Sequence, residues 1–289
     1  MSNLEQTIKS AEKNKIAVGH FNISDLTALK AIFEAAKELD VPVVIGTSRG
    51  EADFLDRREA AALVKALREE YDFPIFLNAD HAHSLKEIKE AVEAGYDAVL
   101  FDAGKLSLDE NIKQTKKAVE LAKSINPDIL IEGELGYIGS SSKVMDGLPE
   151  GLSNLTSLED AARFVEETGV DLLAPAVGNV HGIIKGGNPA LDINRIKEIK
   201  TALRQAQGKL VPLVLHGGSG ISDSDFEKAI EAGISIIHIN TELRVAWRKG
   251  IEEGLKENPG EIAPYKVLPE AVNEIKMVVK KRLKLFNKF

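Results

Sequence analysis

The stretch FPIFLNADHAHSLKEIKEAVEAGYDAVLFDAG, residues 73–104, contains a complete strand–helix–strand unit. Its two ends, 73–81 and 97–104, are short apolar runs of the kind that form buried strands. Between them, apolar residues recur at steps of three and four, which predicts an amphipathic helix between Ser84 and Gly95. Two parallel strands with a covering helix therefore follow from this stretch.

The same unit recurs along the chain. Further runs of strand character occupy 16–22, 41–48, 129–136, 171–181, 211–220 and 234–241, with helix-like segments between them. Eight such units favour an α/β fold in which the strands close into a (β/α)8 barrel. A doubly wound open sheet is the alternative, but no GxGxxG turn follows the first strand. Because no Gly/Ser- or Pro-rich linker divides the chain, we expect one domain over 1–289, with C-terminal helices over 242–289.

The composition limits the class of protein. The 289 residues are 44% hydrophobic and carry a net charge of −8, which argues against nucleic acid or an anionic membrane as the main partner. Since the chain has no cysteine, disulfides, thiolate nucleophiles and Cys-ligated metals are excluded. The sequence shows neither a secretory signal nor an apolar run long enough to span a membrane, so we expect a soluble, cytoplasmic protein.

Polar side chains stand at the end of every predicted strand, and in a barrel these ends form the active-site rim. Three of the six histidines lie there, His81, His181 and His216. Three neutral imidazoles can bind zinc and leave a fourth position open for substrate. A hydrogen-bonded rim residue is the alternative for any one of them, but three on one rim favour a metal. We expect His83 to lie outside the ligand set and His20 to be a buried or supporting residue.

Glycine-rich segments at the same rim predict a phosphate site. HGGSG (216–220) follows the seventh strand and offers backbone N–H groups that side chains do not cover. HINTE (238–242) follows the eighth strand, and barrels commonly bind phosphate after these two strands. HGIIKGG (181–187) adds Lys185 to the rim.

Taken together, these motifs resemble the class II, zinc-dependent ketose-bisphosphate aldolases, a family that includes fructose-bisphosphate and tagatose-bisphosphate aldolases. The resemblance rests on Asp80-His81, Glu134-Leu135-Gly136, the HGxxKG segment 181–186, HGGSG, and the NTELR segment 240–244. It implies a barrel enzyme that reversibly cleaves a ketose 1,6-bisphosphate to dihydroxyacetone phosphate and glyceraldehyde 3-phosphate. Fructose 1,6-bisphosphate is the expected substrate, and tagatose bisphosphate or a related phosphosugar is the alternative.

The same resemblance implies roles for individual residues. Asp80 would transfer the proton, and His81, His181 and His216 would hold the catalytic Zn²⁺. Asp102 and Glu134 match a second or alternative metal position, and a monovalent cation at the phosphate site is a further option. The residues that match the triose-phosphate site are Gly182, Gly217, Gly218, Ser219, His238, Ile239, Asn240 and Thr241, while Ser48 matches a contact to the aldehyde phosphate. Family members usually form homodimers or homotetramers.

Three segments depart from the family pattern. The family usually has Asn-Ile-Asp-Thr where this chain has His238-Ile239-Asn240-Thr241, so a carboxylate is lost at position 240. Asn179-Val180 stands where a small hydroxyl residue usually precedes His-Gly, and residues 140–143 replace a Gly-Gly-x-Glu-Asp stretch. These changes leave the zinc ligands and Asp80 in place and bear on the choice of substrate.

The polar, Gly- and Ser-rich segment 137–157 is too long for an ordinary connection between a strand and a helix. Because it follows Glu134, we expect a mobile loop that covers the site when substrate is bound. Its acidic residues are Asp146 and Glu150, and of the two we expect Glu150 to protonate the substrate carbon.

Two other classes of function fit part of the pattern. A zinc hydrolase would explain the histidines but not the glycine-rich phosphate segments. A non-catalytic phosphosugar-binding barrel is suggested by the changes at 179, 180, 238 and 240. A Schiff-base aldolase is disfavoured, since no lysine stands at the end of a predicted strand.

Overall fold

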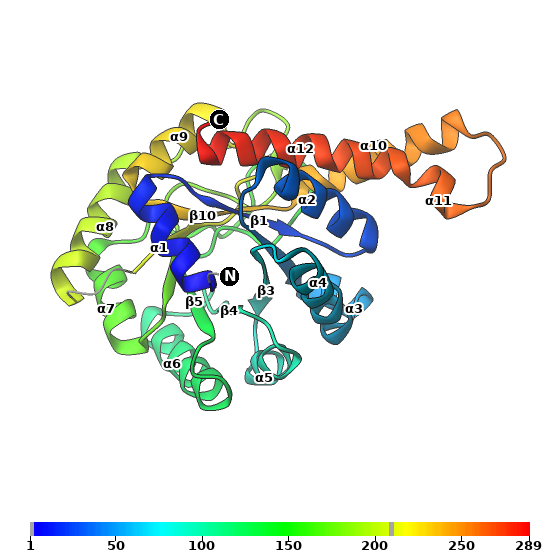
Figure 1. Cartoon of the computed structure of the whole chain (residues 1–289). Helices are drawn as coiled ribbons and strands as arrows, with labels where there is room; N and C mark the ends of the chain where they lie inside the picture. Colours follow the sequence, from blue (N-terminus) through cyan, green and yellow to red (C-terminus); the bar gives the residue numbers. More distant parts are fainter. Residues whose placement is uncertain (1–2, 208–210) are drawn as a thin grey trace.

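The computed structural model describes residues 3–207 and 211–289. Within these residues, eight parallel strands close into a barrel in the order β1-β10-β9-β7-β5-β4-β3-β2 (Figure 1). The barrel strands are β1 (Val18–Asn22), β2 (Val43–Ser48), β3 (Ile75–Ala82), β4 (Ala98–Phe101), β5 (Leu130–Leu135), β7 (Leu172–Pro175), β9 (Leu213–Leu215) and β10 (Ile234–Ile239). The predicted (β/α)8 fold is confirmed.

Helices alternate with the barrel strands, and most helices cover the outer face of the barrel (Figure 1). They are α1 (Leu4–Asn14), α2 (Leu26–Leu39), α3 (Arg49–Phe54), α4 (Arg57–Tyr71), α5 (Leu85–Ala94), α6 (Leu108–Ile125), α7 (Leu158–Thr168), α8 (Ile193–Gln207), α9 (Asp223–Ala232), α10 (Thr241–Glu257), α11 (Pro264–Val267) and α12 (Pro269–Asn287). Local signals fix many of their ends. In α5, for example, the Ser84 side chain caps the first turn, and Gly95 ends the helix with a φ of 90°.

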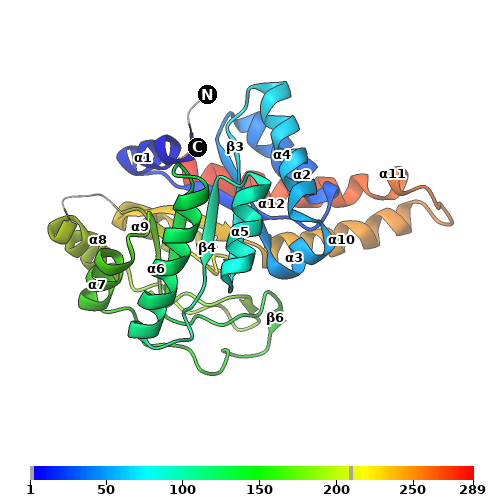
Figure 2. The same ribbon diagram turned by 90° about the horizontal axis from the view of Figure 1, so that it is seen from below.

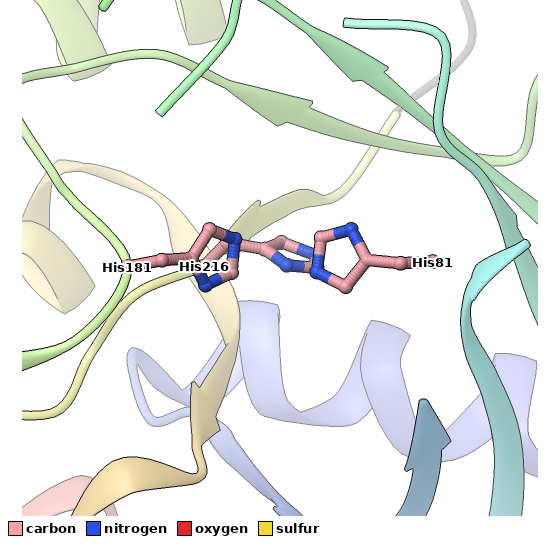
Figure 3. A group of neighbouring side chains, drawn as sticks. All are labelled: His81, His181 and His216. Atoms are coloured by element: carbon pink, nitrogen blue, oxygen red, sulfur yellow. The ribbon is translucent and has the colours of Figure 1, made fainter. Parts of the chain in front are cut away.

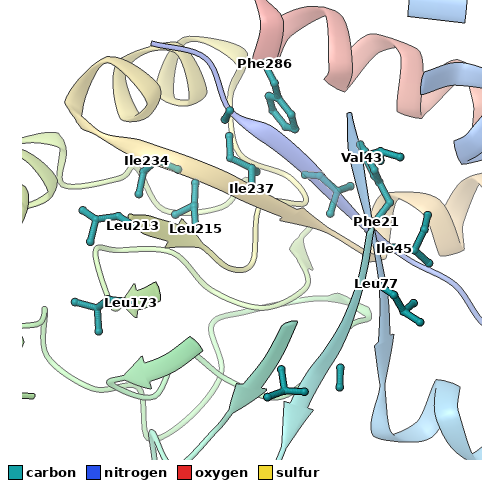
Figure 4. Close-up of a cluster of buried hydrophobic side chains, with 14 of the residues drawn as sticks. Phe21, Val43, Ile45, Leu77, Leu173, Leu213, Leu215, Ile234, Ile237 and Phe286 are labelled. Carbon is teal, nitrogen blue, oxygen red and sulfur yellow. The ribbon is translucent and has the colours of Figure 1, made fainter. Parts of the chain in front are cut away.

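The alternation of side chains along each strand divides the core in two. In β2, Val43 and Ile45 face the surrounding helices, whereas Val44 faces the barrel interior, where it clusters with Phe76 from the neighbouring strand. Figure 4 shows part of the outer cluster, which extends to Phe286 of α12. Complete burial of a side chain of this size contributes about 1.5–3 kcal/mol.

The two ends of the barrel are closed in different ways. Leu4, Ile8 and Ala11 of α1 belong to the inner cluster and close the amino end. The segment that contains β6 (Val144–Met145) lies at the other end (Figure 2). The amino end is thus filled, and the carboxyl end, which the β6 segment borders, is the end at which the sequence predicts the site.

The segment 137–157 is tied to the loop after β7 by a short parallel sheet. In it β6 pairs with β8 (Ile183–Ile184), and the His181 backbone N–H donates to the Ile138 carbonyl at 2.9 Å. The segment thus lies beside the barrel rim. Its mobility stays a prediction.

The C-terminal helices form an arm. Helices α10 and α12 run side by side and project from the barrel, with α11 near the tip (Figure 1). The two helices approach closely because Gly250 faces Ala271, where an added Cβ would lie 2.4 Å from the Ala271 Cα. The inner half of α12 packs on α2 and β1.

Candidate active site

A cavity of about 500 Å³ opens at the carboxyl end of the barrel. Most of the predicted site residues line it: Ser48, Asp80, His81, Asp102, His181, Gly182, His216, Gly217, Ser219, His238, Asn240 and Thr241. The loop segment 139–143 lines one side. The convergence follows from the parallel topology, which brings the ends of all the barrel strands to one rim.

The three predicted zinc ligands face one another across the cavity floor (Figure 3). The His81 ring centroid lies 4.9 Å from that of His181 and 4.9 Å from that of His216, and the latter two are 5.9 Å apart. His81 reaches this position through a left-handed backbone conformation with a φ of 54°, which is rare for a residue other than glycine. It sits where the β3–β4 register shifts, between Ala79 and Ala82. Such local strain is often found at functional sites.

Hydrogen bonds hold one nitrogen of two of these rings and leave the other nitrogen available. Nε2 of His216 lies 2.7 Å from Oε1 of Glu132, and Nδ1 of His81 lies 2.9 Å from Oδ2 of Asp102. Nδ1 of His216 and Nε2 of His181 are buried and have no hydrogen-bond partner. Buried lone pairs of this kind need a partner, and a carboxylate behind a histidine is the usual support of a zinc ligand. The donor set therefore fits Zn²⁺.

The charges around the three rings differ. Burial lowers the pKa of His181 to about 3, helped by the neighbouring His81 and His216, so this ring is neutral. The pKa of His81 lies well above its usual value. Burial by itself would lower it, but the carboxylates of Asp80 and Glu134 outweigh burial. The site thus favours positive charge beside His81, as a metal ion would supply.

Asp102 and Glu134 lie on the far side of His81. Nδ1 of His81 is 3.2 Å from Oε2 of Glu134, and the three side chains bring one ligand atom each to within 4.8 Å of the others. Burial and the nearby Asp102 raise the pKa of the Glu134 carboxyl. A second metal position at these residues stays a prediction.

Asp80 is buried beside the zinc ligands. Its Oδ2 accepts a hydrogen bond from the Asn22 side chain at 2.9 Å, and its Oδ1 lies 3.4 Å from Nδ1 of His238. Burial opposes ionisation, but His81 and His238 outweigh it and hold the pKa of Asp80 well below its usual value. A carboxylate at neutral pH can accept a proton from a substrate hydroxyl.

His238 stacks on His20, with ring centroids 3.5 Å apart and planes inclined by 3°. Burial lowers the pKa of His20 to about 4 and that of His238 well below its usual value, so both rings are neutral. Two parallel rings cannot both direct in-plane lone pairs at one ion. We therefore interpret His20 as a supporting residue, as the sequence suggests.

Glycines shape the side of the cavity at which the sequence predicts phosphate binding. At Gly217 an added Cβ would lie 2.3 Å from the Val180 carbonyl oxygen, and at Gly182 it would lie 2.6 Å from that of Lys143. Only glycine allows these segments to approach, and each has a positive φ of 61° and 91°, respectively. The Ser219 hydroxyl lies 3.3 Å from the backbone N–H of Asn240, which joins the two predicted phosphate loops.

Five predicted site residues are not among those that line the cavity, and Glu134, which is buried beside His81, is one of them. The Gly218 N–H donates to the His238 carbonyl at 3.0 Å, so the run of free amides expected from HGGSG is interrupted. Ile239 is fully buried in the outer core because it alternates with His238 along β10. Lys185 instead pairs with Asp146 at 2.7 Å on the surface. Glu150 is exposed in the loop, outside the set of lining residues.

Other residues in and around the site were not predicted. Asn22 and Glu132 stand at strand ends, where their polarity was the available signal, and they contact Asp80 and His216. Glu51 of α3 is buried and accepts from Asn240 at 3.0 Å. Asn179 bridges two loops, accepting from the Val177 N–H and donating to the His216 carbonyl.

The chain belongs to the class II fructose-bisphosphate aldolase family, whose pattern it matches over residues 2–289. It is 35% identical over 286 residues to a probable fructose-bisphosphate aldolase of Bacillus subtilis, covering 98% of this chain and 96% of the relative. A fructose-bisphosphate aldolase of Staphylococcus aureus is 34% identical with the same coverage. The protein is therefore a lyase of the aldolase class.

Solved structures agree with the fold. The YdjI aldolase of Escherichia coli K12 superposes with a TM-score of 0.80 at 29% identity, over 99% of this chain and 96% of that one. A putative fructose-1,6-bisphosphate aldolase of Coccidioides immitis gives a TM-score of 0.83 at 27% identity, with the same coverage. In the part of the chain that the structure describes, no helix combines the length and apolar character needed to cross a bilayer.

Proposed function

We propose that the protein catalyses the reversible, zinc-dependent cleavage of a ketose 1,6-bisphosphate, with fructose 1,6-bisphosphate as the substrate. The products are dihydroxyacetone phosphate and glyceraldehyde 3-phosphate. The observation that carries the proposal is the convergence of His81, His181 and His216 next to the buried carboxylate of Asp80. Membership of the aldolase family supports the same reaction.

The chemistry divides between the metal and Asp80. Zn²⁺, when held by the three histidines, supplies a positive charge that stabilises the negative charge developing on the ketone half. Asp80 accepts the proton of the C4 hydroxyl as the C3–C4 bond breaks and C4 becomes the aldehyde carbon. The electron pair of that bond stays on the ketone half, which then takes a proton at C3. In condensation Asp80 returns its proton to the new hydroxyl.

Two regions of the cavity are suited to the two halves of the substrate. Gly182, Gly217, Ser219 and Thr241 surround the space proposed for the triose phosphate, and Ser48 lies at the other end. We also propose that Asp102 and Glu134 form a second divalent-metal position, and that a monovalent cation assists phosphate binding.

The proton for C3 is proposed to come from the segment 137–157. In the structure its lining residues are glycine, serine and lysine, and Glu150 is exposed. Closure of the segment over bound substrate would bring Glu150 to the site and exclude water from the reactive carbanion.

A homodimer or homotetramer is proposed as the working form. The arm formed by α10, α11 and α12 exposes large apolar side chains, with Ile262 93% and Tyr265 76% exposed near its tip. Apolar groups gathered in this way are typical of interfaces between subunits. We propose a cytoplasmic location, where phosphorylated sugars are retained.

A coupled assay of the zinc-loaded enzyme with fructose 1,6-bisphosphate and, separately, tagatose 1,6-bisphosphate tests the proposal. Cleavage of the fructose ester that is lost on chelation and restored by Zn²⁺ is expected. Full activity after exhaustive chelation would contradict the zinc mechanism. Release of inorganic phosphate or another hydrolysis product, without triose phosphate, would favour a hydrolase. Binding without turnover would favour a non-catalytic barrel.

A further inference from the structure

A buried carboxylate in α3 connects the cavity wall at four points. Glu51 is 5% exposed. Its Oε1 accepts from the Asn240 side chain at 3.0 Å and from Nη2 of Arg244 at 2.7 Å. Its Oε2 accepts from the Asn22 side chain at 2.8 Å and from the Ser48 backbone N–H at 2.7 Å. All four donors belong to residues that line the cavity, whereas Glu51 itself lies behind them.

From this geometry we infer that Glu51 is the positioning residue of the cavity wall between Asn240 and Ser48. It supplies from α3 the carboxylate that position 240 lacks and holds Arg244 toward the aldehyde half of the substrate. The inference rests on the proposed function. A carboxylate has about four acceptor positions, and here all of them are used by the wall. Glu51 therefore has no capacity left to bind substrate and acts only through its four partners.

The bonds to Glu51 decide which donors face the substrate. The Ser48 N–H is occupied, so an anionic aldehyde substituent at this end would have to be bound by side chains. Arg244 is the suitable one: it lines the cavity, its side chain is 47% exposed, and Glu51 anchors it by one nitrogen. Bonds between ionised groups are stronger than neutral ones, which fixes the guanidinium and limits the entropy lost when substrate binds.

The contact with Asn240 makes the position of the negative charge testable. Because Asn240 and Arg244 donate to the same oxygen of Glu51, only one carboxylate fits between them. An aspartate at 240 beside Glu51 would place two carboxylates where an amide–carboxylate hydrogen bond now stands, and like charges at this distance repel. In Glu51→Ala, an aspartate at position 240 could instead accept the hydrogen bond that Arg244 now donates to Glu51.

The experiment measures condensation kinetics for three variants: Glu51→Ala, Asn240→Asp and the double variant. Each single change is expected to raise the KM for glyceraldehyde 3-phosphate about tenfold or more, with a smaller effect on kcat. The KM of the double variant for glyceraldehyde 3-phosphate is expected to be at least about threefold lower than that of either single variant. Proton exchange at the carbon of dihydroxyacetone phosphate that becomes C3 of the ketose needs only the triose half. In Glu51→Ala it should fall by a smaller factor than the KM for glyceraldehyde 3-phosphate rises.

Controls separate positioning from folding. Asp53→Asn removes an exposed carboxylate from the same helix and should leave the kinetics unchanged. Glu51→Gln keeps the shape of the side chain but replaces a hydrogen-bond acceptor by a donor. It should therefore raise the KM for glyceraldehyde 3-phosphate. Its thermal midpoint should fall no further than that of Glu51→Ala. Losses that add in the double variant, or an unchanged KM in Glu51→Ala, would overturn the inference. A wild-type enzyme that cleaves neither bisphosphate would instead overturn the proposed function.

Discussion

Asp80 carries the proton transfer in the proposed reaction, and its surroundings separate that role from folding. Replacing it by asparagine keeps the volume and retains a partner for Asn22, but it removes the proton acceptor. We expect Asp80→Asn to lower kcat about 10²–10⁴-fold, the usual contribution of general acid–base catalysis. Zinc content, by metal analysis, and the thermal midpoint should stay near those of the wild type. A near-normal rate would assign the proton transfer to another group.

His181 tests the ligand set. Its Nε2 is buried and has no hydrogen-bond partner among the described residues, as expected for a nitrogen that binds a metal. His181→Ala should lose zinc and activity together, as measured by metal stoichiometry and cleavage rate. His83→Gln is the matched control, because Nδ1 of His83 bonds the Asp102 carbonyl at 2.9 Å and the side chain is 51% exposed. His20→Gln should likewise retain zinc. Stoichiometric zinc in His181→Ala would contradict the proposed ligands.

The sequence allows the ligands to be predicted but not their support. His81, His181 and His216 could be found because strand ends meet at one rim whatever the details of packing. Glu51 could not, because its role depends on how a short helix turns back over Ser48. Lys185 and Glu150 lie outside the cavity lining: beside the small β6–β8 sheet Lys185 pairs with Asp146 on the surface, and the role of Glu150 stays a prediction.

At the scale of elements, α2 and α12 are joined by a charged cluster. Glu38 of α2 pairs with Lys276 and with Lys280 of α12, the latter at 2.7 Å. These hydrogen bonds lower the pKa of Glu38 from 4.5 to about 2. Because the folded-state pKa is depressed, the stabilisation is complete above the unfolded value and is lost as pH falls toward the folded one.

Glu38→Gln should therefore be less stable than the wild type near neutral pH, with a difference that shrinks below about pH 4.5. Urea unfolding at several pH values measures it. Glu166→Gln, an exposed carboxylate on α7, is the control and should show a smaller, flatter difference. A difference that grows on acidification would refute the assignment.

The segment 137–157 is the element with the clearest proposed motion. Glu150→Gln should slow exchange of the pro-chiral C–H proton of dihydroxyacetone phosphate, on the carbon that becomes C3 of the ketose, more than it weakens binding of that substrate. Asp146→Asn is the comparison, since Asp146 is held by Lys185. Unchanged exchange in both variants would mean that the segment only covers the site and that the proton comes from His238 or water.

At the scale of the whole molecule, the arm stands out because it projects from the barrel and leaves apolar side chains exposed within one subunit. Ile262 at its tip is 93% exposed. If the arm packs against a second subunit, Ile262→Glu should shift the protein toward smaller species in light scattering at micromolar concentration. Ile125→Glu, at the end of α6 on the other side of the barrel, should leave the assembly unchanged (Figure 1). An unaltered assembly in Ile262→Glu would exclude the arm tip from the interface.

The closure of the barrel also has a consequence for biosynthesis. Strand β1 is made early, yet one of its two neighbours is β10, and the Ala17 N–H donates to the carbonyl of Phe286 near the end of the chain. While translation proceeds, one edge of β1 has no partner, and open strand edges are prone to pairing between chains. The rim that collects Asn22, Asp80 and His238 cannot assemble until β10 has left the ribosome. A premature stop that removes only α12 would therefore yield a chain that keeps every proposed catalytic side chain but cannot cover its first strand.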